Sequence, residues 1–214
     1  MLTREKLNIL IAEFLGTAML TLTVLVVGRM FGSGTEAWYV AISAGAALAL
    51  IVAKLGHVSG AHVNPAVTIG MWTLKKIPTT NAVVYIAAQM LGGASALLFY
   101  NYATNDTLIS AGAAAFDWRV FWVEATGAAV FGAGIVAAIT QKYEGMYAAL
   151  TIGASLTAGA LLASLASAGF LNPAVALGNN AWNKTLAIAP VVGMVVGMNI
   201  YAELLAPKQT KKKK

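Results

Sequence analysis

The stretch Gly56–Thr68 reads GHVSGAHVNPAVT, and Gly169–Asn180 reads GFLNPAVALGNN, so the tripeptide Asn-Pro-Ala occurs twice in this chain of 214 residues. Asparagine before a helix and proline in its first position both favour a helix start at the tripeptide. The apolar segments that follow, Pro65–Leu74 and Pro173–Trp182, contain ten residues each. A ten-residue helix is about 15 Å long, which is half of the roughly 30 Å of hydrocarbon in a bilayer. The two segments are therefore predicted to be half-helices.

The composition places these half-helices in a membrane. Hydrophobic residues make up 59% of the chain and charged residues 10%, and the mean hydropathy is +0.74, whereas soluble domains are about a quarter charged. The absence of cysteine excludes a disulfide scaffold. The net charge of +6 does not indicate a nucleic-acid partner, because five of the fourteen basic residues lie in the last seven positions. We therefore predict an all-α membrane protein with a single domain, residues 1–214.

Six other stretches are long and apolar enough to cross a bilayer as helices, which takes about 20 residues each. The first is too long for the apolar part of a signal peptide and lacks a cleavage site of small residues, so we interpret it as a span. Eleven basic residues lie on the side of both termini and three on the other side, which predicts cytoplasmic termini. Without a targeting peptide, the plasma membrane is the expected location. The predicted spans are Leu7–Val27, Ala37–Ala53, Ala82–Tyr100, Val120–Ile139, Met146–Leu165 and Leu186–Leu205.

The two halves of the chain are similar to each other. Glu13 of the first span recurs as Glu124 of the fourth, and Asn64 recurs as Asn172 at nearly the same offset along the chain. Each half has three full spans, so the second half must enter the membrane from the opposite face. This predicts an inverted repeat whose half-helices dip towards the midplane from opposite sides, and broken helices at matching places point to a solute site. The predicted division is repeat one at 1–102, a linker at 103–116, repeat two at 117–206 and a basic tail at 207–214.

The asparagines at the start of the half-helices have a chemistry suited to neutral solutes. The side-chain oxygen of Asn64 or Asn172 can accept a hydrogen bond from the backbone of its own helix, which leaves the amide NH₂ group to face outward. Each helix N-terminus also carries about half a unit of positive charge. Where the two ends meet, the site is expected to donate hydrogen bonds to oxygen atoms and to repel cations, including hydronium.

The motifs resemble those of the aquaporin and aquaglyceroporin family, the major intrinsic proteins. Gly56–Thr68 is similar to the first signature loop of that family almost residue for residue, and Ala12–Thr17 is similar to its first-helix motif. The resemblance extends from Ala12 to Tyr201 and implies six transmembrane helices, two re-entrant half-helices, and a homotetramer with one pore per subunit for water and small neutral solutes. The pore residues that it implies are Asn64, Pro65, Ala66, Asn172, Pro173 and Ala174, with the backbone carbonyls of Gly60, Ala61, His62, Ala168, Gly169 and Phe170.

The second motif departs from the family pattern. The family usually continues Asn-Pro-Ala with an arginine that forms one wall of the narrowest region, and here that residue is Val175. By spacing from the motifs, the selectivity filter consists of Ala44, Ala160, Gly169 and Val175, with no aromatic ring or charge unless Phe170 takes a neighbouring position. We predict a wide apolar filter and a passive channel for water and small neutral solutes, such as glycerol, urea or ammonia. A strict water channel and a non-conducting structural member are the alternatives.

Two carboxylates lie inside predicted spans, where an unsatisfied charge costs about 3 kcal/mol or more. Glu13 and Glu124 either relay protons or accept hydrogen bonds from the backbone of the motif loops. The repeat symmetry favours the structural role. Gln89 of the third span is also predicted to have a structural role. The two histidines, His57 and His62, share one loop without a third metal ligand, so no metal or cofactor is predicted. No nucleophile is paired with a positioned base, so neither a catalytic residue nor an enzyme is predicted.

Overall fold

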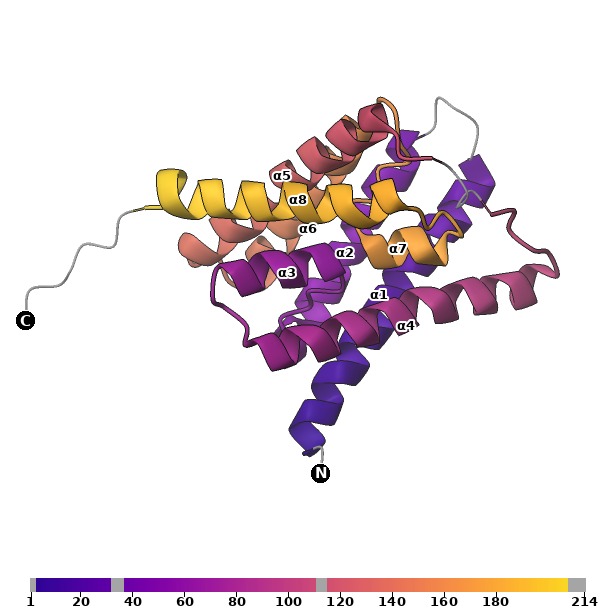
Figure 1. The fold of residues 1–214 in the computed structure, drawn as a ribbon. Helices are drawn as coiled ribbons and strands as arrows, with labels where there is room; N and C mark the ends of the chain where they lie inside the picture. Colours follow the sequence, from indigo (N-terminus) through magenta and orange to yellow (C-terminus); the bar gives the residue numbers. More distant parts are fainter. Residues whose placement is uncertain (1–2, 32–36, 111–114, 208–214) are drawn as a thin grey trace, which may run out of the picture.

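The computed structural model describes residues 3–31, 37–110 and 115–207. All regular secondary structure in these ranges is helical (Figure 1). Residues 208–214 of the predicted basic tail and 111–114 of the predicted linker lie outside the described residues. The elements are α1 (Arg4–Phe31), α2 (Ala37–Ser59), α3 (Pro65–Thr73), α4 (Thr79–Thr104), α5 (Trp118–Thr140), α6 (Gly145–Ala163), α7 (Pro173–Gly178), α8 (Lys184–Ile200) and the short π-helix η1 (Tyr201–Leu205).

Counted over the described ranges, six helices are long and apolar enough to cross a membrane. They are α1, α2, α4, α5, α6 and α8 continued by η1, which confirms the six predicted spans. Most begin or end a few residues outside the apolar stretch, because helical hydrogen bonding continues past the hydrocarbon boundary. The fifth span ends earlier than predicted, at Ala163 instead of Leu165, because the chain turns at 164–167 to enter the second motif loop.

The two short helices lie between α4 and α8 in the middle of the molecule (Figure 1). Asn64 and Asn172 cap them, and the prolines occupy their first positions, as the motifs predict. The first helix has nine residues, close to the predicted ten, whereas α7 has only six and is about 9 Å long. It ends early because Asn180 adopts a left-handed φ of 53°, after which the N–H of Ala181 donates back to the Ala176 carbonyl at 3.0 Å.

Glycines allow the long helices to approach closely, as small residues do in membrane bundles. Gly45 of α2 and Gly153 of α6 face each other, and a Cβ on either would overlap the other's carbonyl oxygen. Gly193 and Gly197 of α8 lie in the same way against the backbone of α5. These close crossings hold the long helices in fixed positions around the centre of the bundle.

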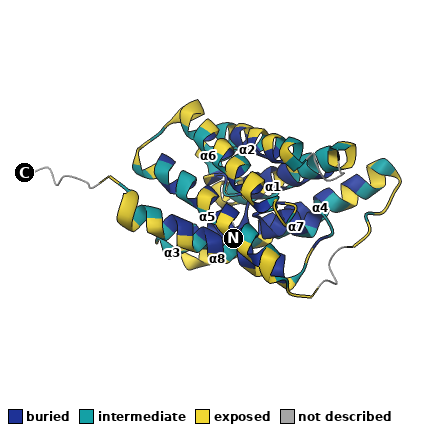
Figure 2. Ribbon diagram, turned by 90° about the horizontal axis from the view of Figure 1, so that it is seen from above, coloured by how far each residue is buried: buried dark blue, intermediate teal, exposed yellow. Residues whose placement is uncertain are grey.

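The outer surface of the bundle is apolar. Large hydrophobic side chains on the long helices are widely exposed, including Leu91 at 62% and Leu98 at 71%. Figure 2 shows that the exposed residues lie along the outer sides of the helices and the buried residues towards the inside. Glu13, Gln89 and Glu124 are completely buried, so polar groups lie inside and apolar groups outside. This is the arrangement of a multi-pass membrane protein, and it places the polar chemistry at the centre of the molecule.

Candidate functional site

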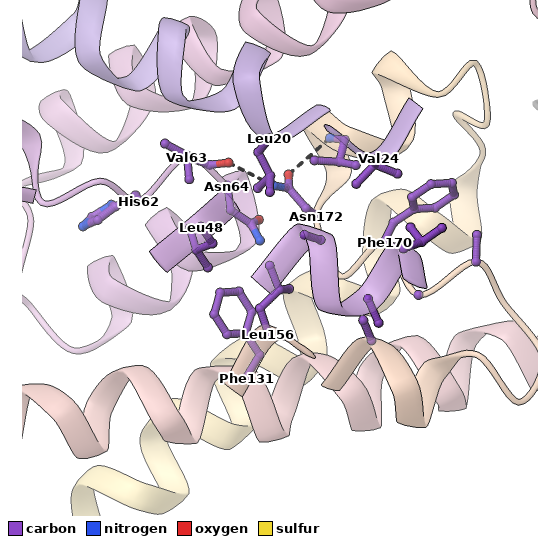
Figure 3. Close-up of a pocket in the computed structure, with 17 residues that line it drawn as sticks. Leu20, Val24, Leu48, His62, Val63, Asn64, Phe131, Leu156, Phe170 and Asn172 are labelled. Atoms are coloured by element: carbon purple, nitrogen blue, oxygen red, sulfur yellow. Dashed lines mark hydrogen bonds between the residues drawn. The ribbon is translucent and has the colours of Figure 1, made fainter. Parts of the chain in front are cut away.

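A cavity lies at the centre of the bundle, where the two motif loops meet α1, α2, α5 and α6. Figure 3 shows His62 and Phe170 at its two ends, with Asn64 and Asn172 between them. Most of the lining side chains are aliphatic or aromatic, and the charged residue types are absent from the lining set. The chain therefore surrounds an apolar passage that contains two amide groups.

Each asparagine caps its own half-helix and thereby fixes its side chain. The Oδ1 atom of Asn64 accepts from the backbone N–H of Ala66 at 2.8 Å. The Oδ1 atom of Asn172 accepts from Ala174 at 3.0 Å and from Val175 at 3.4 Å. Because the oxygen is held by the helix, the NH₂ group of each side chain points away from it, as the capping argument predicts.

The NH₂ groups also join the two halves of the chain. Asn64 donates to the carbonyl oxygen of Leu171 at 2.9 Å, and Asn172 donates to that of Val63 at 2.9 Å. The sequence analysis expects the two amides to present a pair of donors to a solute oxygen. In the structure, one N–H of each amide reaches the opposite loop, so the other N–H of each amide is left for the cavity.

Glu13 holds the first motif loop in place. Its carboxylate accepts from the Ser59 hydroxyl at 2.6 Å, from the backbone N–H of His62 at 3.0 Å and from that of Val63 at 2.7 Å. Gln89 of α4 adds a fourth donor at 2.7 Å. With both carboxylate oxygens occupied and the side chain fully buried, Glu13 has the contacts of a loop anchor.

Glu124 holds the second motif loop through equivalent hydrogen bonds. It accepts from the Ser167 hydroxyl, from the backbone N–H of Phe170 at 3.0 Å and from that of Leu171 at 2.8 Å. No counterpart of Gln89 donates to it among the hydrogen bonds of the described residues. The two carboxylates thus have equivalent backbone partners, one in each half of the chain.

These anchors turn the loop carbonyls away from the glutamates. In a trans peptide, the N–H and the preceding C=O point in opposite directions, and the described residues contain no cis peptide. Since the N–H groups of His62 and Phe170 point to the glutamates, the carbonyls of Ala61 and Gly169 point away from them. Gly60 and Gly169 adopt left-handed φ angles of 84° and 68°, which glycine tolerates well.

All four predicted filter positions contribute to the cavity lining. They come from different parts of the chain, and their side chains are small. Phe170 lines the cavity as well, so an aromatic ring is present beside the small residues. The four positions are Ala44 of α2, Ala160 of α6, Gly169 of the second loop and Val175 of α7.

The sequence reasoning did not identify four bulky apolar residues that also line the cavity. They are Leu20 of α1, Leu48 of α2, Phe131 of α5 and Leu156 of α6. An apolar residue in a long apolar helix carries no signal of its own about which side it faces. In the described ranges, no three His, Cys, Asp or Glu side chains lie close enough together to hold a metal ion.

Comparisons with known proteins give one consistent result. The family described as "Major intrinsic protein" matches residues 2–201. A probable aquaporin NIP7-1 of Arabidopsis thaliana is 31% identical over 94% of this chain and 78% of its own length. The aquaporin AqpM of Methanothermobacter thermautotrophicus is 30% identical over 77% of this chain and 76% of its own. The crystal structure of an aquaglyceroporin from Plasmodium falciparum has the same fold, with a TM-score of 0.73 at 22% identity, covering 94% of this chain and 97% of the other.

Proposed function

This chain belongs to the major intrinsic protein family, whose members are passive membrane channels and not enzymes, and from that premise we propose that it conducts water together with small neutral solutes of the size of glycerol, urea or ammonia. In this proposal the central cavity is the pore. The proposed pore residues are the two Asn-Pro-Ala motifs, of which Asn64 and Asn172 line the cavity. The proposed selectivity filter is Ala44, Ala160, Gly169 and Val175.

The observation that carries this proposal is the lack of bulk and charge at the filter positions. Ala44, Ala160 and Gly169 have minimal side chains, and Val175 has no group that could hold a water molecule. A filter for water alone needs side chains that narrow the passage and donors that orient a single molecule. Small apolar walls instead leave room for the carbon skeleton of a polyol or an amide.

The polar path for such solutes is proposed to follow the motif loops. The free amide N–H groups of Asn64 and Asn172 would donate to a hydroxyl or carbonyl oxygen. The loop carbonyls that the glutamates turn away, at Ala61, His62 and Gly169, would accept from hydroxyl and amine groups. With no arginine at position 175, cation exclusion would rest on the amides and on the positive ends of the half-helices.

The proposed membrane orientation and oligomeric state are based on the charge pattern of the sequence and on the exposed apolar surface of the structure. An excess of basic residues on the side of both termini supports cytoplasmic termini. The plasma membrane is the proposed location. A homotetramer with one pore per subunit is proposed because it would cover part of the apolar surface formed by residues such as Leu91 and Leu98.

The test is transport through proteoliposomes that contain the purified protein. Stopped-flow light scattering would record shrinkage in an impermeant osmolyte for water and re-swelling in glycerol or urea for solute flux, against empty liposomes. Water and solute fluxes above that background are expected. Water flux without solute flux would indicate a strict water channel, and no flux at all would indicate a non-conducting structural member.

A further inference from the structure

Building on the proposed conducting pore, we propose that the upper limit on solute size is set at the middle of the pore by the ring of Phe131. The phenyl group of Phe131 acts together with the side chains of Leu20, Leu48 and Leu156. We call these four residues the midplane ring. The proposed selectivity filter, whose side chains are small, would then contribute less to the limit on solute size than the midplane ring does.

The midplane ring consists of two pairs related by the internal repeat. Phe131 follows Leu20 at the same offset along the chain at which Glu124 follows Glu13. Similarly, the offset from Leu48 to Leu156 equals that between the two motif asparagines. The four side chains therefore occupy equivalent places in the two halves. An inverted repeat brings such equivalent places together around its centre.

The structure places the ring beside the two asparagines. In Figure 3, Leu20 lies on one side of Asn64 and Asn172, and Phe131 and Leu156 lie together on the other side. All four members of the ring line the same cavity. A solute that moves between the two ends of the cavity must therefore pass Phe131 at the point where it meets the amides.

Side-chain size along the cavity indicates where the passage is narrowest. The proposed filter positions are nearly as buried as the midplane ring, since Val175 is 2% and Phe131 is 2% exposed, so burial does not distinguish the two places. Their side chains differ in size, because the filter positions carry two alanines, a glycine and a valine, whereas the midplane ring carries three leucines and a phenylalanine that line the same cavity. The free cross-section is therefore expected to be smallest beside the midplane ring.

Packing behind the ring prevents Phe131 from moving aside. The next residue of α5, Gly132, lies so close to α8 that a Cβ there would come within 2.8 Å of the Met194 sulfur and 3.0 Å of Met198. The backbone of α5 therefore has no free space behind it. Phenylalanine is also the largest member of the ring and the one that breaks its symmetry, because its equivalent is Leu20.

The experiment compares the permeability to glycerol with that to water in proteoliposomes. Phe131→Leu gives the ring four leucines, and we expect the glycerol-to-water permeability ratio to rise about tenfold, the discrimination that a small change of apolar shape provides. The matched control is Phe121→Leu on the same helix, because Phe121 packs against Ala125 and Ala189 and does not line the cavity. This control is expected to keep the wild-type ratio.

A second variant tests the ring from the opposite direction. Leu20→Phe adds the aromatic ring at the equivalent position, and glycerol flux is expected to fall below the wild-type value while Phe131 is unchanged. An unaltered ratio in Phe131→Leu, in a wild-type protein that conducts glycerol, would overturn this inference and leave the proposed function standing. Equal changes in Phe131→Leu and Phe121→Leu would also overturn it. Absence of flux in the wild type and in every variant would overturn both proposals.

Discussion

Asn64 and Leu171, which are 107 residues apart in the chain, are joined by a 2.9 Å hydrogen bond from the asparagine amide to the leucine carbonyl. The equivalent bond from Asn172 to Val63 has the same length. The side chains of the two motifs therefore bind the loops of the opposite halves as well as capping their own helices. Changes at the asparagines are expected to affect both the architecture of the pore and its electrostatics.

Replacement of Asn64 by aspartate tests the role of the amide in excluding cations. Asn64→Asp keeps an oxygen that can cap α3 but removes the donor to Leu171 and adds a negative charge in the cavity. We expect a cation or proton leak, measured with a pH-sensitive dye or a sodium-sensitive dye inside proteoliposomes. Asn183→Asp is the matched control, because Asn183 also caps a helix, α8, but does not line the cavity. Tight vesicles with Asn64→Asp would contradict the proposed role.

A charged residue at position 175 tests whether that position faces the pore. Val175→Arg places a long cationic side chain where the cavity is lined by alanine and glycine, and glycerol flux is expected to fall about tenfold or more through lost space. The neutral variant Val175→Leu is expected to reduce flux less. Unchanged glycerol flux in properly folded Val175→Arg would show that Val175 does not border the solute path.

The buried carboxylate of Glu13 is predicted to stabilise the fold. Glu13→Gln would turn an NH₂ group towards donors such as the N–H groups of His62 and Val63, and an unsatisfied buried group costs roughly 1–3 kcal/mol. We expect a lower thermal unfolding midpoint in detergent, measured by circular dichroism. The control is Glu203→Gln, since Glu203 is exposed. A variant with wild-type stability but altered proton flux would instead favour the relay hypothesis.

The close approach of α8 to α5 predicts sensitivity at Gly193. A Cβ at this position would overlap the backbone of Ala125, so Gly193→Ala is expected to lower the free energy of unfolding by about 1–3 kcal/mol. Gly28→Ala in α1 is the control, because nothing lies within 4 Å of a Cβ there. Chemical denaturation in detergent would measure both. Equal stabilities of the two variants would contradict the tight helix crossing.

The sequence predicted the elements whose signals are local. Apolar stretches long enough to span a bilayer identified the six long helices, and Asn-Pro identified the first turns of α3 and α7. The length of α7 was overestimated because its end depends on Asn180, whose left-handed φ of 53° turns the chain so that the N–H of Ala181 donates to the Ala176 carbonyl at 3.0 Å. Apolar content alone does not contain that information.

The lining of the cavity was predicted only in part. Residues such as Ala160 and Val175 were found because they lie at fixed distances from the motifs. Phe131 and Leu156 were missed because every face of these helices is apolar, so hydrophobic periodicity does not separate the pore side from the lipid side. The internal repeat held a usable signal, since Phe131 follows Leu20 at the same offset that separates the two buried glutamates.

The two kinds of buried polar contact have different consequences for biosynthesis. Glu13 and Glu124 bind loops only 43 to 50 residues further along the chain, within their own halves. Asn64 and Asn172 bind across the halves, over 107 and 109 residues. Each half can therefore shape its own loop soon after it leaves the ribosome. In contrast, the partner of Asn64 in the first motif is Leu171, which lies in the last third of the chain. Translation that stops before this residue would therefore yield an ordered first loop without a closed channel.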